Sequence, residues 1–162
     1  MARVINRVRE MTPQDIESVM VIEEATFPAP WSRRMLTDEL AAPGRYYIVL
    51  DGPDGIEGYG GAMVSDQEGH VMTMAVGSDR RGRGLGTTLL SALLSAALGM
   101  GASRLLLEVR PSNMAARHLY QKFGFVPVGV RPRYYRDEDA LVMWVDDADT
   151  PEYAARLAEL SR

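Results

Sequence analysis

The hydrophobic and polar positions of the chain fall into stretches with helical spacing and short apolar runs typical of strands. The longest helical stretch covers about residues 84–100, where leucines recur three or four positions apart and Gly101 provides a stop. Thr12 followed by Pro13 is a helix start, and that helix should run to about Thr26. The other predicted helices cover residues 33–42 after Ser32, a short segment after Asn113, and a tail from Thr150.

The β-rich runs predict strands at residues 45–51, 56–65, 71–76, 103–109, 125–131 and 140–145. Gly52-Pro53-Asp54-Gly55 is a hairpin signal between the first two runs. The order of elements predicts an α/β fold with one core, in which helices flank a mixed sheet. We expect one domain over residues 1–149 and a C-terminal helical extension over residues 150–162.

Composition and charge narrow the classes of function. The net charge of −4 over 162 residues argues against nucleic acid as the main partner and permits a basic peptide substrate. The N-terminus, Met1-Ala2-Arg3, is not followed by the apolar core of a signal peptide, and the apolar runs are too short to span a bilayer. We therefore expect a cytoplasmic protein without membrane contact. The absence of cysteine excludes disulfides and acyl-cysteine intermediates. His70 and His118 match no metal-ligand spacing, so we expect both at the surface or in loops and no metal site.

A glycine-rich loop carries the clearest chemical signal. Arg81-Gly82-Arg83-Gly84-Leu85-Gly86 lies between a predicted strand and the start of the long helix. Backbone N–H groups at a helix start bind anions, and glycines let a phosphate approach closely because they have no Cβ. Arg81 and Arg83 add positive charge at the same place. The loop predicts a phosphate-binding site, with a glycine-rich turn carrying solvated arginines as the alternative.

Two common phosphate motifs do not fit this loop. A dinucleotide site would place an acid about 20 residues downstream, where Glu108 stands, but the loop lacks the G-x-G-x-x-G spacing. A P-loop would require Gly-Lys followed by Ser or Thr, which is missing. The loop therefore matches neither motif, and both a phosphate site of another kind and a simple glycine-rich turn remain open.

Arg81-x-x-Gly84-x-Gly86 after a strand resembles the R/Q-x-x-G-x-G/A motif of the GNAT acetyltransferases. The resemblance implies a GNAT-like, mostly antiparallel sheet, with the loop binding the pyrophosphate of acetyl-CoA and the preceding strand pairing with its pantetheine arm. The implied cofactor-binding residues are Met74, Ala75, Val76, Arg81, Gly82, Arg83, Gly84, Leu85, Gly86, Thr87 and Asn113.

Four further segments resemble the RimI branch of this family, whose members acetylate the N-terminal alanine of a ribosomal protein. They are Phe27-Pro28-Ala29-Pro30-Trp31-Ser32, Leu107-Glu108-Val109-Arg110-x-x-Asn113, Leu119-Tyr120 with Gly124-Phe125, and Arg133-Tyr134-Tyr135 with Glu138-Asp139-Ala140. The first has two extra residues, and the last has a displaced arginine and a shorter loop. Archaeal and eukaryotic N-terminal acetyltransferases share several of these motifs, so the resemblance does not fix one substrate.

The resemblance assigns catalytic roles to Glu108 and Tyr120. Glu108 ends an apolar strand, where a carboxylate is costly to bury, and it would act as general base through water. The alternative is a structural ion pair with Arg104 or Arg110. Tyr120 would protonate the thiolate of CoA, although a tyrosine at that spacing is otherwise a core residue.

The substrate side rests on aromatic residues. Trp31, Tyr134 and Tyr135 would line a groove for a peptide N-terminus, or they are core aromatics. An α-amine near pKa 8 is about 10% neutral at pH 7, whereas lysine near 10.4 is below about 0.1%, which favours an N-terminus as substrate. A lysine or small-molecule acetyltransferase and a non-catalytic acyl-CoA-binding module remain the alternatives. Glu108 and Tyr120 together argue against the binding module, which would need neither.

Overall fold

The computed structural model describes residues 6–161. Met1-Ala2-Arg3, on which the expected location rests, and Arg162, the last residue of the expected extension, lie outside the described residues. Within that range seven strands form one sheet in the order β1-β2-β3-β4-β5-β7-β6. All neighbouring strands are antiparallel except β4 and β5. The strands are β1 (Arg7–Glu10), β2 (Arg45–Gly52), β3 (Gly55–Ser65), β4 (Glu68–Val76), β5 (Arg104–Val109), β6 (Val126–Arg131) and β7 (Ala140–Val145). The predicted mixed, mostly antiparallel sheet is confirmed.

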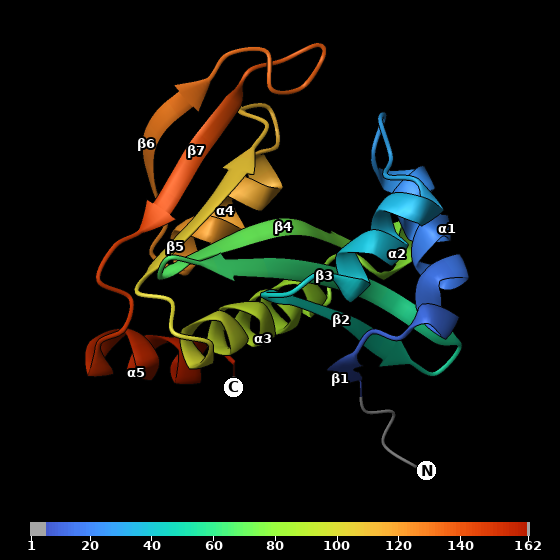
Figure 1. Ribbon diagram of the computed structural model, residues 1–162, viewed down its shortest axis with the longest axis horizontal. Helices are drawn as coiled ribbons and strands as arrows, with labels where there is room; N and C mark the ends of the chain where they lie inside the picture. Colours follow the sequence, from blue (N-terminus) through green and yellow to red (C-terminus); the bar gives the residue numbers. More distant parts are fainter. Residues whose placement is uncertain (1–5, 162) are drawn as a thin grey trace.

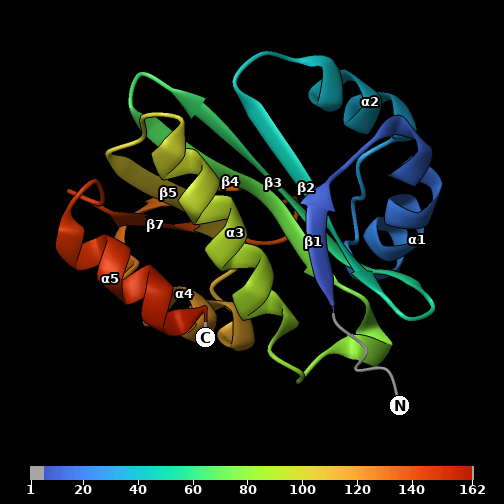
Figure 2. The same ribbon diagram turned by 90° about the horizontal axis from the view of Figure 1, so that it is seen from below.

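Helices cover both faces of this sheet (Figure 2). They are α1 (Ile16–Thr26), α2 (Arg33–Ala41), α3 (Leu85–Gly99), α4 (Met114–Lys122) and α5 (Pro151–Leu160). Alternate residues of a strand point to opposite faces, and β2 shows the result. Ile48 and Leu50 pack with α3, whereas Tyr47 and Val49 pack with α1 and α2. The sheet therefore lies between two apolar clusters.

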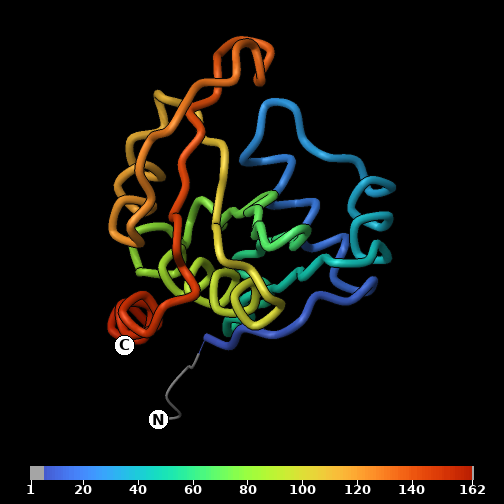
Figure 3. Tube along the Cα trace, turned by 60° about the vertical axis from the view of Figure 1, so that its left-hand side comes forward, coloured from blue at the N-terminus to red at the C-terminus, as the bar shows by residue number. Residues whose placement is uncertain are grey.

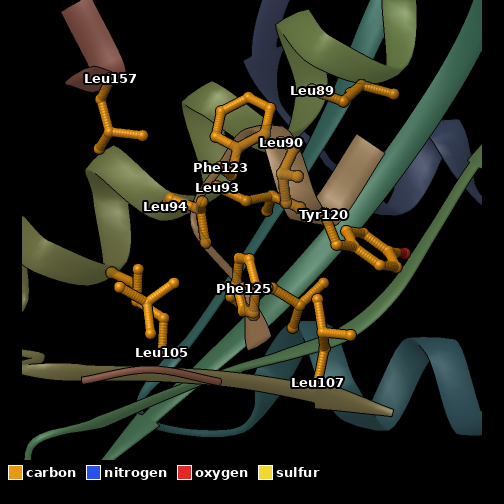
Figure 4. Close-up of a cluster of buried hydrophobic side chains, with 14 of the residues drawn as sticks. Leu89, Leu90, Leu93, Leu94, Leu105, Leu107, Tyr120, Phe123, Phe125 and Leu157 are labelled. Carbon is orange, nitrogen blue, oxygen red and sulfur yellow. The ribbon is translucent and has the colours of Figure 1, made fainter. Parts of the chain in front are cut away.

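The C-terminal helix α5 packs on the cluster that contains α3. Tyr153 and Leu157 are buried there, and the Tyr153 hydroxyl donates a hydrogen bond to the Phe123 carbonyl at 2.6 Å. Figure 4 shows Leu157 beside the leucines of this cluster. The division into a domain of residues 1–149 and an extension of residues 150–162 stays a prediction.

The sequence pattern did not reveal β1. This strand is four residues long and three of them are charged, so it shows no apolar run. It pairs with β2, and Arg9 binds Asp15 at 2.8 Å and Asp51 at 2.6 Å. Its position is thus fixed by strand pairing and by ion pairs between distant residues.

The sheet divides where β4 meets β5. These parallel strands pair only at Glu68, Gly69 and His70, and beyond that point they separate. Figure 1 shows β5, β7 and β6 standing at a steep angle to β4. The pairing of β3 with β4 is irregular between Gly61 and Ala62, which leaves Met72 as an extra residue in β4. The C-terminal halves of β4 and β5 therefore lie on either side of an opening in the sheet.

Candidate active site

A cleft of about 930 Å³ occupies the opening between β4 and β5. Its walls come from β4, the glycine-rich loop, the end of β5, α4 and two loops far apart in sequence. Of the predicted site residues, those that line the cleft are Trp31, Met74, Ala75, Val76, Arg81, Gly82, Gly84, Leu85, Gly86, Glu108, Asn113, Tyr120, Tyr134 and Tyr135. Arg83 and Thr87 do not line it: Arg83 is exposed and Thr87 is half-buried in the first turn of α3.

The glycine-rich loop presents backbone to the cleft. Gly82 and Gly84 have φ values of +81° and +76°, a region that favours glycine, and a Cβ on either would meet no atom within 4 Å. Gly84 is the N-cap of α3 and offers no side chain to cap the first N–H groups. The helix N-terminus is therefore open to an anion at this point.

Arg80, which the sequence did not single out, anchors the segment before this loop. Its guanidinium lies 3.1 Å from Asp54 and 3.5 Å from the buried Glu57. These acids come from the β2–β3 turn and the start of β3, so the ion pairs tie the loop to the sheet.

Glu108 is held by residues of two other strands. Its side chain is 4% exposed, and its Oε2 lies 2.5 Å from Nε2 of His70 on β4. Its Oε1 lies 3.4 Å from Nε of Arg131 at the end of β6. The alternative expectation of a pair with Arg104 or Arg110 is wrong, because Arg104 binds Asp146 and Arg110 binds Asp137.

The expectation that His70 lies at the surface or in a loop is also wrong. His70 lies within β4 opposite Leu106, and Glu108 follows two residues later on the same face of β5. Only the pairing of β4 with β5 brings the two side chains together. His118 is exposed on α4.

Tyr120 lies on α4 at the boundary between the core and the cleft. Its ring packs with Phe125 at 6.0 Å between centroids, and in Figure 4 its hydroxyl lies at the end of the ring away from the leucines. Burial, with a smaller contribution from Tyr135, raises the pKa of Tyr120 to about 12. The phenol is therefore protonated at neutral pH and can donate a hydrogen bond into the cleft.

The Acetyltransferase (GNAT) family model matches residues 16–125, which is more than half of the chain. The chain belongs to the GNAT acetyltransferase family. GNAT enzymes use acetyl-CoA, and the residues present fit this co-substrate because the glycine loop leaves a helix N-terminus open to an anion in the wall of the cleft. No group of three or more His, Cys, Asp or Glu side chains between residues 6 and 161 is arranged to hold a metal ion.

Relatives and solved structures extend the similarity beyond the family model. A Bacillus subtilis protein provisionally named a ribosomal protein bS18-alanine N-acetyltransferase is 38% identical over 85% of this chain and 93% of its own. The ribosomal protein bS18-alanine N-acetyltransferase of Salmonella typhimurium is 30% identical over 86% and 96%. The crystal structure of the ribosomal-protein-S18-alanine N-acetyltransferase from Escherichia coli aligns with a TM-score of 0.80 and 28% identity, covering 88% and 94%. The RimI resemblance is thereby confirmed.

Asn113 reaches the wall of the cleft from the start of α4. Its Oδ1 accepts a hydrogen bond from the Ala116 N–H at 3.2 Å, so the predicted N-cap is present. The side-chain NH₂ group takes no part in that bond, and Asn113 lines the cleft.

Two loops at one end of the molecule supply the aromatic walls (Figures 1 and 3). In the α1–α2 loop, the Trp31 N–H donates to Glu23 at 3.1 Å, and the buried Glu23 also accepts from the Tyr59 hydroxyl. In the β6–β7 loop, Tyr134 and Tyr135 pack edge to face at 5.0 Å between centroids.

The β6–β7 loop is fastened to the β5–α4 connection. Glu138 accepts hydrogen bonds from the N–H and hydroxyl of Ser112 at 3.0 and 2.8 Å. The Arg110 guanidinium binds Asp137 at 2.7 Å and lies 4.2 Å above the ring of Tyr135. These contacts fix the aromatic residues beside Glu108.

No helix of the described chain is both long and apolar enough to cross a membrane.

Proposed function

We propose that this GNAT enzyme acetylates the α-amino group at the N-terminus of a ribosomal protein that begins with alanine. The observation that carries the proposal is the cleft itself. It joins an open helix N-terminus, a buried carboxylate, a protonated tyrosine and three aromatic side chains. The names of the relatives support the choice of substrate. A ribosomal substrate would place the reaction in the cytoplasm, with a protein N-terminus rather than nucleic acid or a membrane as partner.

The glycine-rich loop and β4 would hold acetyl-CoA. N–H groups of the first turn of α3 would bind the pyrophosphate, with Arg81 adding charge. Met74, Ala75 and Val76 would pair their backbone with the pantetheine arm, and Asn113 would donate to it from α4. Arg83 and Thr87 would contribute less, because neither lines the cleft.

Glu108 would act as general base. The amine must be neutral to attack the thioester, and Glu108 would accept its proton directly or through a water molecule. His70 binds Oε2 and would hold the carboxylate in place at the wall of the cleft. Because an α-amine titrates closer to neutrality than lysine does, one carboxylate suffices for it.

Tyr120 would stabilise the leaving thiolate. The bond between the carbonyl carbon and sulfur breaks as the amide forms, and the sulfur needs a hydrogen-bond donor at that moment. A phenol with a pKa near 12 is a weaker acid than a thiol near 8.5, so Tyr120 acts chiefly by donating a hydrogen bond to the sulfur. With no cysteine to carry an acetyl group, transfer would occur directly in a ternary complex.

Trp31, Tyr134 and Tyr135 would form the walls of the peptide groove. The test is CoA release across peptides that differ only in their first residue, with N-terminally blocked, lysine-containing peptides as controls. Turnover of the alanine peptide and none of the blocked peptide supports the proposal. Preferential turnover of the blocked peptide would show a lysine acetyltransferase, and no turnover of any amine would leave a binding module.

A further inference from the structure

Arg131 at the end of β6 reaches the carboxylate of Glu108. Its Nε lies 3.4 Å from Oε1 of Glu108, and the Arg131 side chain is 53% exposed whereas that of Glu108 is 4% exposed. Oε1 is buried and accepts no hydrogen bond from the residues that the structure describes. One oxygen of Glu108 is thus bound to His70, while the other has only the charge of Arg131 beside it.

The strand register places Arg131 on this face. Glu108 pairs with Val142 across β5 and β7, and Val142 pairs with Gly129 across β7 and β6. Cross-strand partners share a face, and Arg131 returns to that face two residues after Gly129. The pairing of β6 with β7 shifts between Pro127 and Gly129.

That shift decides where Arg131 points. It leaves Val128 as an extra residue, and without this residue Arg131 would lie on the opposite face of the sheet. Bulges of this kind commonly redirect a side chain beside an active site. The register irregularity and the ion pair are separate observations that agree on the same contact.

We propose that Arg131 is a positioning residue for Glu108: its guanidinium holds Oε1, the oxygen that His70 does not bind, where it can receive the proton of the amine. The inference rests on the proposed function, in which Glu108 is the base. Arg131 does not line the cleft, so it acts through Glu108 and touches neither substrate. The other polar groups near Glu108 are His70 from β4 and Tyr134 and Tyr135 from the β6–β7 loop.

If the ion pair were purely structural, removing Arg131 would affect stability and leave turnover unchanged. The effect on stability should be small in any case, because Arg131 is half-exposed. A positioning role instead makes the effect on turnover depend on Glu108. Two residues that act as a unit show non-additive effects when both are changed.

The test is a double-mutant cycle of Arg131→Gln and Glu108→Gln, with kcat and the KM for acetyl-CoA measured for each variant. Arg131→Gln should lower kcat about tenfold with an unchanged KM, the loss expected when one contact to a charged group is removed. In the Glu108→Gln background the same change should have no further effect. Arg131→Lys should restore most of the activity, and Arg34→Gln, an exposed arginine of α2, should be neutral.

An equal loss in both backgrounds would overturn the proposal, as would an Arg131→Gln enzyme with normal kcat. A fully active Glu108→Gln enzyme would instead refute the base assignment, and the inference with it. Melting temperatures show whether each variant folds. If the glutamine variant is unstable, Arg131→Met keeps the aliphatic stem and removes the charge, and the same cycle is run with it.

Discussion

Nε2 of His70 lies 2.5 Å from Oε2 of Glu108, although 38 residues separate the two in the chain. The contact exists because β4 and β5 are parallel neighbours at His70 and Leu106 and separate immediately afterwards. The pair therefore lies at the base of the cleft, where the sheet opens. The carboxylate therefore has one oxygen bound to the imidazole and the other beside the guanidinium of Arg131.

Removing the imidazole should weaken catalysis without weakening cofactor binding. His70→Leu should lower kcat about 10- to 100-fold, the equivalent of a buried hydrogen bond to a charged group. The KM for acetyl-CoA should stay the same, because the pyrophosphate loop is untouched. His118→Leu is the matched control, since His118 is exposed on α4. Equal effects of the two substitutions on kcat would rule out a role for the His70–Glu108 contact.

Glu108→Gln keeps the shape of the side chain but removes its ability to take a proton. We expect kcat to fall about 10²- to 10⁴-fold with little change in the KM for acetyl-CoA. The defect should shrink as pH rises, because more of the amine is then already neutral. The kcat of both proteins is measured across pH. A decrease in kcat that is constant with pH would show that Glu108 is a structural residue and not the base.

Tyr120 and Tyr153 form a matched pair for testing the hydroxyl at the cleft. Tyr120→Phe should lower kcat strongly and leave the melting temperature nearly unchanged. Tyr153→Phe removes a hydrogen bond to the Phe123 carbonyl, so it should cost about 1 kcal/mol of stability and leave kcat unchanged. With a pKa of about 12, Tyr120 should also produce no alkaline loss of activity below about pH 11. A fully active Tyr120→Phe enzyme would remove this residue from the mechanism.

Substitutions at Gly84 and Gly55 distinguish a loss of cofactor binding from an effect of backbone strain. Both have positive φ and open space around a Cβ, so a substitution strains the backbone at either position. Gly84→Asp should abolish the rise in melting temperature that acetyl-CoA causes, because a carboxylate would occupy the phosphate seat. Gly55 is the first residue of β3, far from the phosphate seat in the sequence, and Gly55→Asp should preserve that rise. If Gly84→Asp folds and binds acetyl-CoA normally, the pyrophosphate does not bind at this loop.

Local patterns in the sequence predicted most of the fold. The hairpin at Gly52-Pro53-Asp54-Gly55 and the cap Asn113 depend on nearby residues, and both occur in the structure. The glycine-rich loop was predicted correctly as the turn before a helix for the same reason. Strand β1 was not predicted, because its pairing with β2 and the ion pairs of Arg9 join distant residues.

The residues that contact Glu108 could not be predicted from spacing in the sequence. Its neighbours in the chain, Arg104 and Arg110, turn to other acids, and its real partners come from β4 and β6. Finding His70 requires the parallel register of β4 with β5. Finding Arg131 requires the irregular pairing of β6 with β7. Neither register has a local signal in the residues of these strands.

The most direct test of the account is the position of the acetyl group on a single peptide that offers both kinds of amine. A peptide with a free N-terminal alanine and an internal lysine is incubated with the enzyme and acetyl-CoA, and fragment-ion mass spectrometry locates the product. Acetylation is expected at the α-amino group in the wild-type enzyme, and Glu108→Gln should lose that product. Acetylation at the lysine, with the N-terminus left free, would contradict it.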